Sequence, residues 1–507
     1  MRTLLTLKNT YWGIISQVII LLIGFITRKI FLITLGTSYL GLNSLFTNVI
    51  SLISLAELGI SGAIIYHLYK PFKNNDKIEI AKLMNLYKDT YRIIAGSITI
   101  IGISFIPFIE YVINDSTFTI VYTRLIFCIF LFDTVVSYFF SYKRSIIFVD
   151  QKNYIILVCD TTFRILIAGV NIVVLVLTNN FIIYLLSSVA LKLLNNFAIA
   201  IIADKKYPYI KSKEKLEQEK RKEIFINIKD IFINKLSWTI TSATDNLIIS
   251  IYFNLSTIGL IANYNLIILS LQTFVTKILE SSQASVGNLL VQGTSNHIYI
   301  VLKRLNLLAF FVASLCGVCL FVLINPFISI WIGQEYLVEK TLVAILICNF
   351  FLFVVRLPLW QMMGVSGLFK QEKNIALIGT GINLVISLGL VRYVGLSGVF
   401  LGTLISILVQ IILKIPLFFN EFLKIKPREY FYELLRFVVL FLIETLIAYY
   451  ISSFIQIENL YLKLIVLLFI CLCVPIFINY LVFKNTDEFK YLINLIRKIL
   501  SRKKASV

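Results

Sequence analysis

The chain has 507 residues, of which 59% are hydrophobic and 15% are charged, and its mean hydropathy is +0.89. This composition excludes a soluble globular protein and indicates an integral membrane protein. A net charge of +20 could suggest nucleic acid binding. A basic cytoplasmic surface beside anionic lipids is, however, ordinary for a membrane protein, so we expect membrane lipids and no nucleic acid as its partners.

Apolar runs recur along nearly the whole sequence. A helix needs about 20 apolar residues to cross the roughly 30 Å hydrocarbon layer. Runs of about this length lie at 11–35, 42–66, 93–113, 120–141, 155–177, 181–203, 232–253, 259–281, 305–331, 342–364, 375–392, 397–419, 436–455 and 463–483. The alternation typical of membrane β-barrels is absent. We therefore predict an all-α polytopic membrane protein with about 14 transmembrane helices.

The basic residues predict the orientation. They gather in segments 70–92 and 204–223 and in the tail 484–504, whereas the connections 114–117 and 178–180 contain no Lys or Arg. Because positively charged loops stay in the cytoplasm, both termini are predicted to be cytoplasmic.

The charged segment that follows the sixth run suggests a division of the chain. We expect a six-helix bundle over 1–203, a cytoplasmic linker over 204–231 and a second six-helix bundle over 232–419. Residues 420–507 then form two additional helices and a basic amphipathic tail.

The two expected bundles match weakly in sequence. The stretch 27–46 and the stretch 244–265 share a polar pair, an apolar run, a Gly-Leu step and an Asn, so that Arg28 and Asp245 occupy matching places. The segments 148–156 and 368–377 match at nearly the same offset. Parallel repeats of this kind are typical of transporters that alternate access to a central site.

Several chemistries find no support in the sequence. It contains no G-x-x-x-x-G-K-[ST] loop, so we do not expect ATP hydrolysis. The seven cysteines lie in or near apolar runs, and even Cys316 and Cys319 lie mid-helix, so neither a metal site nor a disulfide framework is expected. We predict no enzyme, no catalytic residue and no cofactor.

Ionisable residues deep in a bilayer are costly and therefore default to functional hypotheses. Residues near run ends can reach the interface and need no role: Lys235, Lys277, Glu280, Arg392, Lys414 and Lys463. The deep ones are Arg28, Lys29, Glu57, Asp133, Lys192, Asp245, Arg356 and Glu444. Asp160 and Arg164, spaced i, i+4, either form an ion pair with each other or serve a cavity.

Arg28 and Lys29 stand side by side in the first run. They either pair with acids such as Glu57 or Asp245 or face an anionic substrate. Arginine suits a phosphate or pyrophosphate because its planar fork donates to two oxygens and keeps its charge. An exporter of organic cations would more naturally present carboxylates and aromatic rings.

Five segments together carry a resemblance. They are YLGLNSLFTNVISLISLAELGISGAIIYHLYKP (39–71), MNLYKDTYRIIA (84–95), TDNLIIS (244–250), QASVGNLL (283–290) and GLFKQEKN (367–374). Because these five segments occur in this order, the chain resembles the Wzx-type polysaccharide flippases of the multidrug/oligosaccharidyl-lipid/polysaccharide (MOP) exporter superfamily. The resemblance covers essentially its full length.

The resemblance implies two MATE-like six-helix bundles, two extra helices and a cationic cavity. It also implies transfer of an undecaprenyl-pyrophosphate-linked oligosaccharide to the outer leaflet of the bacterial plasma membrane, for capsule or O-antigen synthesis. Arg28 matches the arginine of the family's first helix, and Arg356 the arginine before GLFK. Asp245 matches the acid of TDN, and Glu57 the acid of LAELGI.

Two sets of site residues follow. Candidates for binding pyrophosphate or sugar are Arg28, Lys29, Arg164, Lys192 and Arg356, of which Lys29, Arg164 and Lys192 rest on depth and charge alone. Candidates for ion coupling or for charge pairing are Glu57, Asp133 and Asp245, with H+ or Na+ as the ion. Polysaccharide polymerase and glycosyltransferases are candidate partners. A lipid II flippase and a multidrug antiporter remain the alternatives.

Overall fold

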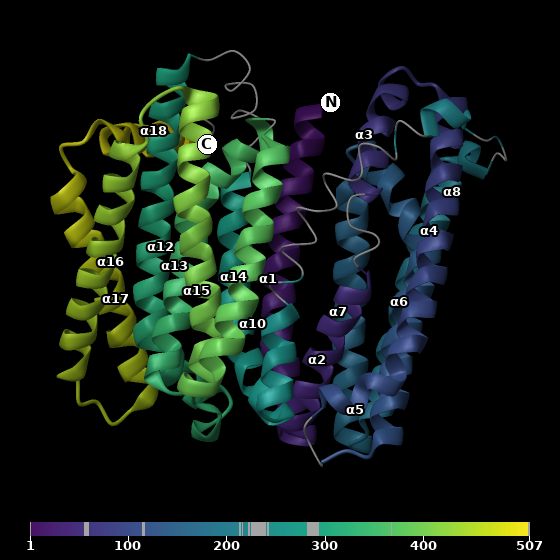
Figure 1. The fold of residues 1–507 in the computed structure, drawn as a ribbon, viewed down its shortest axis with the longest axis horizontal. Coiled ribbons are helices and arrows are strands. Elements are labelled where there is room, and N and C mark those ends of the chain that lie inside the picture. The colour runs from purple at the N-terminus through teal and green to yellow at the C-terminus, as the bar shows by residue number, and fades with distance from the viewer. Residues whose placement is uncertain are drawn as a thin grey trace. The chain divides into compact units, whose positions relative to one another are not determined.

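The computed structural model describes residues 2–54, 60–113, 117–211, 214, 216–221, 224, 240, 243–280, 294–366 and 368–504. In these residues the chain is helical and contains no strand. The helices are α1 (Arg2–Leu35), α2 (Thr37–Ile53), α3 (Ile60–Lys73), α4 (Lys77–Phe105), α5 (Ile109–Val112), α6 (Ile120–Val149), α7 (Asn153–Thr178), α8 (Phe181–Lys206), α10 (Leu255–Glu280), α12 (Ser295–Trp331), α13 (Lys340–Ser366), α14 (Phe369–Val394), α15 (Leu396–Leu417), α16 (Arg428–Ser453), α17 (Leu460–Phe483) and α18 (Asp487–Lys504), as Figure 1 shows. The all-α fold class is confirmed.

Twelve helices in the described residues are long and apolar enough to cross a membrane. They correspond to twelve of the fourteen runs expected from the sequence. The run 42–66 falls on α2 and α3, which flank residues outside the described ranges. The first part of the run 232–253, residues 232–239, also lies outside them. The chain is a multi-pass membrane protein, and about 14 helices is consistent with the structure.

Several helices extend well beyond their apolar runs because polar caps fix where they begin. Asp76 accepts a hydrogen bond from the backbone N–H of Glu79 at 3.0 Å, so α4 begins at Lys77 although its apolar run begins at 93.

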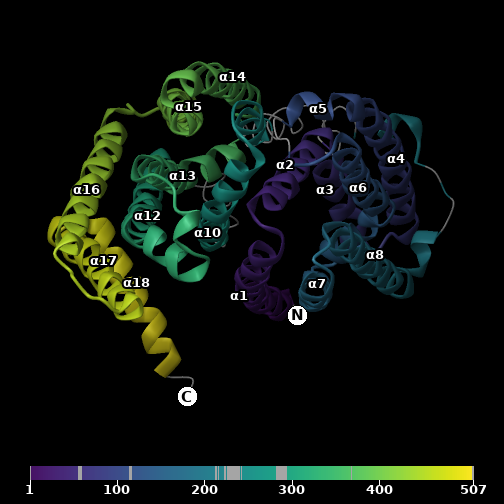
Figure 2. The same cartoon turned by 90° about the horizontal axis from the view of Figure 1, so that it is seen from below.

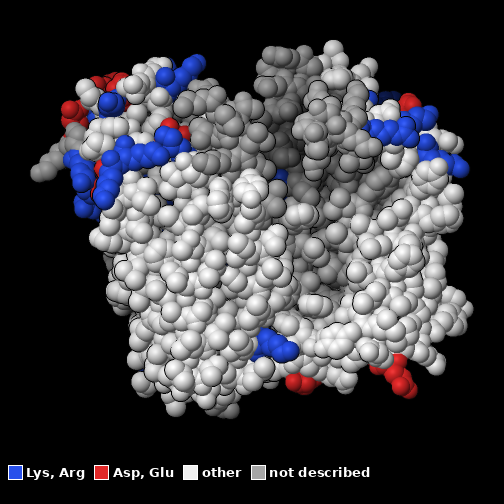
Figure 3. Space-filling model, turned by 180° about the vertical axis from the view of Figure 1, so that it is seen from behind, with Lys and Arg blue, Asp and Glu red and all other residues white. Residues whose placement is uncertain are grey.

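On the side drawn in Figure 3, Lys and Arg side chains gather at one end of the helices in each unit, and the middle of the helices is almost uncharged.

The described residues separate into two compact units, Met1–Ala262 and Asn263–Val507. The boundary between the two units lies within α10, because residues 255–262 of this helix belong to the first unit. Of the predicted linker 204–231, residues 204–211, 214, 216–221 and 224 are described, and α8 extends into it as far as Lys206. The predicted domain limits stay a prediction.

The first unit brings two matched repeat segments together, where α2 crosses the start of α10. A Cβ at Gly41 would meet the backbone oxygen of Leu255, and a Cβ at Gly259 would meet the backbone oxygen of Thr37. The hydroxyls of Thr37 and Ser256 hydrogen bond at 2.7 Å. Gly41 and Gly259 are the glycines of the two Gly-Leu steps, so each repeat presents its glycine to the backbone of the other.

The second unit packs α14 on α15 and α12 on α13. The two additional helices, α16 and α17, lie beside α12, as the end-on view of Figure 2 shows. The interpretation of Lys414 as an interfacial residue is wrong, because its side chain is only 4% exposed. Its Nζ donates to Glu372 Oε1 at 2.5 Å and lies 4.3 Å from the centre of the Trp360 ring. The packing of α15 on α14 places Lys414 against Glu372 inside the unit.

Candidate functional site

The first unit contains a cavity of about 440 Å³ between four helices. The helices are α1, α6, α7 and α8, which pack on one another in the first unit. On α7 the lining residues recur at helical spacing, from Asp160 through Arg164 and Ile167 to Asn171, and so occupy one face of the helix. That face combines charged and amide groups in the part of the helix where lipid-facing residues would be apolar.

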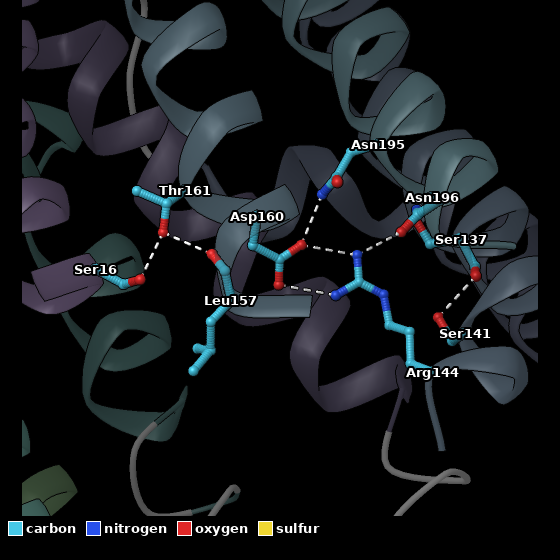
Figure 4. A network of polar contacts seen from close by, with 9 residues as sticks. All are labelled: Ser16, Ser137, Ser141, Arg144, Leu157, Asp160, Thr161, Asn195 and Asn196. Atoms are coloured by element: carbon cyan, nitrogen blue, oxygen red, sulfur yellow. Dashed lines mark hydrogen bonds and ion pairs between the residues drawn. The ribbon is translucent and has the colours of Figure 1, made fainter. Parts of the chain in front are cut away.

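A polar network crosses the cavity wall from α6 to α7 and α8 (Figure 4). Arg144 donates to both carboxylate oxygens of Asp160, at 2.9 and 3.0 Å, and to Oδ1 of Asn196 at 3.0 Å. Asn195 Nδ2 donates to Asp160 Oδ1 at 2.7 Å. Both carboxylate oxygens of Asp160 therefore accept hydrogen bonds from Arg144, and Oδ1 also accepts one from Asn195. The ion pair between Asp160 and Arg164, one alternative that the sequence left open, does not form.

A second network ties the cavity wall on α7 to α1. The hydroxyl of Thr161 donates to Ser16 Oγ at 2.7 Å, and this Thr161 hydroxyl also lies 2.7 Å from the backbone oxygen of Leu157 (Figure 4). This contact fixes α1 against the helix that carries Asp160 and Arg164.

Lys192 and Asp133 form the other ion pair of the site. The Nζ of Lys192 lies 2.7 Å from Oδ2 of Asp133, and their side chains are 50% and 16% exposed. Lys192 lines the cavity, whereas Asp133, on α6, is not one of the lining residues. The structure thus gives Asp133 the charge-partner role, one of its two predicted roles.

Arg164 differs from the other two cations of the cavity. It is exposed, lines the cavity, and makes no ion pair or hydrogen bond with any residue that the structure describes. Arg144 and Lys192 each face a carboxylate, so Arg164 is the lining cation that has no carboxylate partner among the described residues.

The rest of the polar wall carries amides and hydroxyls. Asn171 Nδ2 donates to the hydroxyl of Ser188 at 2.8 Å, and Ser187 donates to Asn171 Oδ1 at 3.0 Å. Asn195 Oδ1 is buried and has no hydrogen-bond partner among the described residues. Groups of this kind can exchange hydrogen bonds with sugar hydroxyls and phosphate oxygens.

Solved structures share this architecture, although no family model and no curated protein sequence matches the chain. An inward closed structure of the lipid II flippase MurJ superposes with a TM-score of 0.67 at 15% identity, covering 94% of this chain and 99% of MurJ. An inward-facing multidrug resistance MATE transporter of the MOP superfamily gives 0.57 at 14% identity, covering 77% and 92%. The chain has the fold that these MurJ and MATE structures share. A eukaryotic MATE transporter agrees, with a TM-score of 0.54 at 12% identity over 82% of this chain and 95% of the transporter.

Within this fold, the cavity contains some of the predicted residues and not others. Arg164 and Lys192 line it, and Asp133 pairs with Lys192. Arg28 is half-buried on α1 next to the lining and interacts electrostatically with Tyr184, a lining residue. Lys29 is exposed on α1 and is not part of the lining.

The other predicted residues lie elsewhere. Arg356 belongs to the second unit, where its guanidinium lies 5.2 Å from the ring centres of both Phe353 and Trp360. Asp245 is half-buried in the first unit and is not in the cavity lining. Glu57 lies outside the described residues. The described residues contain no group of three or more His, Cys, Asp or Glu that could hold a metal ion.

Arg144 is a charged residue of the cavity lining that the sequence did not lead us to name. The apolar run of α6 ends near 141, so Lys143 and Arg144 look like the start of a cytoplasmic connection, but the helix continues to Val149. A usable signal existed, because Asp160 is a deep acid that needs a cation and Arg144 is close to it in sequence.

A double-mutant cycle tests the Arg144–Asp160 pair. With Arg144→Ala, Asp160→Ala and the double variant, we expect an interaction energy of about 1–2 kcal/mol in unfolding free energy. This value is below that of a fully buried pair because the side chains are 27% and 31% exposed. Additive single effects in detergent-solubilised protein would show that the bidentate contact contributes nothing.

Proposed function

We propose that this chain is a transporter that flips an oligosaccharide linked to a lipid pyrophosphate, such as undecaprenyl pyrophosphate, from the cytoplasmic to the outer leaflet of a bacterial plasma membrane. One observation carries the proposal. Arg164 is exposed in the cavity of the first unit and has no partner among the described residues, while the other two lining cations each face a carboxylate.

The charge of the cavity favours an anionic substrate. Arg144 is neutralised by Asp160 and Lys192 by Asp133, so Arg164 gives the site a net positive charge. A guanidinium donates two parallel hydrogen bonds to a phosphate group and does not lose its charge in a low-dielectric site. The surrounding amides and hydroxyls, among them Asn171 and Asn195, suit a sugar next to the phosphate.

An organic-cation antiporter is the second candidate, because MATE transporters share the fold. Such a substrate would need a carboxylate in the cavity, and the lining acid Asp160 is already bound by Arg144 and Asn195. The residues that line the cavity therefore favour an anion over a cation.

A lipid II flippase is the alternative that differs least from the proposal. The structure of MurJ, described as a lipid II flippase, matches 94% of this chain. Lipid II and a polysaccharide repeat unit share the lipid pyrophosphate that Arg164 would bind, and they differ in the sugar. Capsule or O-antigen synthesis, cytoplasmic termini, and the roles predicted for Arg28, Lys29 and Arg356 belong to the same proposal. A polysaccharide polymerase and glycosyltransferases would then be its partners in the pathway.

Transport in proteoliposomes tests the choice of substrate. We expect purified protein to move a fluorescent undecaprenyl-pyrophosphate oligosaccharide between leaflets, measured by quenching from one side, and not to accumulate a fluorescent organic cation. Faster movement of lipid II than of the oligosaccharide would favour the lipid II reading. Accumulation of the organic cation without movement of either lipid would overturn the proposal.

A further inference from the structure

The second unit holds a carboxyl group that the proposed cavity does not use. Glu444, on α16, is 0% exposed. Its Oε2 accepts a hydrogen bond from the hydroxyl of Ser314, on α12. Its other oxygen, Oε1, is buried and has no hydrogen-bond partner among the described residues. Buried polar atoms are nearly always paired, so this oxygen needs an explanation.

A second acceptor without a donor lies in the same cluster. Asn479, on α17, donates from Nδ2 to the Ser314 hydroxyl at 3.3 Å. Its Oδ1 is buried and also has no partner among the described residues. Three helices, α12, α16 and α17, therefore bring Ser314, Glu444 and Asn479 to one point, and two buried acceptor oxygens of this cluster have no donor among the described residues.

Among the described residues, no cation forms an ion pair with Glu444. The titratable groups within the middle of the neighbouring helices are mostly thiols: Cys316 and Cys319 on α12, Cys471 and Cys473 on α17 and Cys348 on α13. The one cation there in the described residues is Arg356 on α13, whose guanidinium lies 5.2 Å from the ring centres of Phe353 and Trp360. Phe441, one turn before Glu444, packs face to face on Phe351 with ring centres 4.1 Å apart. An unpaired carboxylate in such surroundings would lose its hydration energy, and no nearby positive charge would offset that loss.

A proton satisfies the cluster better than a metal ion does. A protonated carboxyl adds one O–H donor, which is what two unpaired acceptors lack. Hard cations such as Ca²⁺ take six or more oxygen ligands, whereas the side chains of Ser314, Glu444 and Asn479 bring four oxygens.

We propose that Glu444, with Ser314 and Asn479, forms a proton-binding site between α12, α16 and α17. The proton leaves only when water or a cation reaches the carboxylate, that is, when the packing of these three helices opens. Proton release is thereby coupled to a rearrangement of the second unit. That this proton is the coupling ion of transport rests on the proposed function.

Infrared spectroscopy of the full-length protein in lipid tests the site directly. At neutral pH we expect the carbonyl band of a protonated carboxyl, present in the wild type and in Glu458→Gln, an exposed glutamate, and absent in Glu444→Gln. Ser314→Ala should shift this band, because it removes the hydrogen bond to Oε2. This variant also keeps the test decisive if Glu444→Gln does not fold.

Two results would overturn the site. One is that the expected carboxyl band is not assigned to Glu444. This holds if the wild-type spectrum in potassium buffer lacks the band, or if neither Glu444→Gln nor Ser314→Ala alters it. The other is loss of the band when sodium replaces potassium, which would assign the cluster to a metal ion.

A pH gradient across proteoliposomes then tests the coupling. We expect the wild type to flip its lipid substrate several-fold faster with the gradient than without it, and Glu444→Gln to flip at one rate in both conditions. An equal response of Glu444→Gln and wild type would remove the coupling role. If the wild type flips no lipid at all, the proposed function fails while the infrared result still decides the proton site.

Discussion

Replacing Arg164 with alanine is expected to weaken binding of the lipid-linked substrate by about 10- to 150-fold. A hydrogen bond to a charged group contributes about 1.5–3 kcal/mol, and about 1.4 kcal/mol corresponds to a factor of ten. Arg164 makes no contact that its removal would leave unpaired in the described residues, so folding should be unchanged. Substrate-dependent flipping and thermal unfolding of the same preparation measure the two effects.

Two variants serve as controls. Arg164→Lys keeps the charge but loses the planar fork, so its affinity should lie between those of the wild type and Arg164→Ala. Arg92→Ala removes the same charge from an exposed position on α4 and should leave flipping unchanged. Full flipping by Arg164→Ala would contradict the assignment of the anion site.

Substituting alanine for Gly41 or Gly259 is expected to give the largest loss of stability. A Cβ at Gly41 would overlap the backbone oxygen of Leu255, and a Cβ at Gly259 that of Thr37, so the backbones of α2 and α10 would have to separate. Overpacking of this kind costs about 3 kcal/mol. We expect a lower unfolding temperature for each variant in detergent.

Matched glycines elsewhere separate crowding from helix propensity. Nothing lies within 4 Å of a Cβ at Gly96 or Gly169. Alanine there should leave stability unchanged or raise it by up to about 1 kcal/mol, because alanine favours the helix. If Gly41→Ala were as stable as Gly96→Ala, the close crossing of α2 and α10 would not exist in the protein.

Much of the fold could be predicted from the sequence because the bilayer allows few alternatives. Continuous apolar runs can only be helices there, and twelve of the expected runs are long helices. Helix ends could not be placed from hydropathy. α4 begins at Lys77, far before its apolar run, because a cap at Asp76 and not lipid determines its start.

The candidate site could be predicted only in part. Charge at depth identified Arg164 and Lys192, but it could not tell which cation already has an acid. Lys192 pairs with Asp133, 59 residues away, and Arg144 pairs with Asp160, 16 residues away. These pairings depend on how α6, α7 and α8 pack.

Distance to the end of an apolar run was also a poor guide to burial. By this criterion Lys414 was set aside, yet it is buried with Glu372 beside Trp360. Arg144 was missed for the same reason. Glu444 was recognised as deep but had no visible partner, because Ser314 and Asn479 become its neighbours only through helix packing.

One measurement tests the central claim most directly, namely the leaflet in which the lipid-linked oligosaccharide accumulates when the protein is depleted in its own host. The account predicts accumulation on the cytoplasmic side, reversed by wild type and by Arg92→Ala but not by Arg164→Ala. Unchanged sidedness with normal surface glycan after depletion would contradict it.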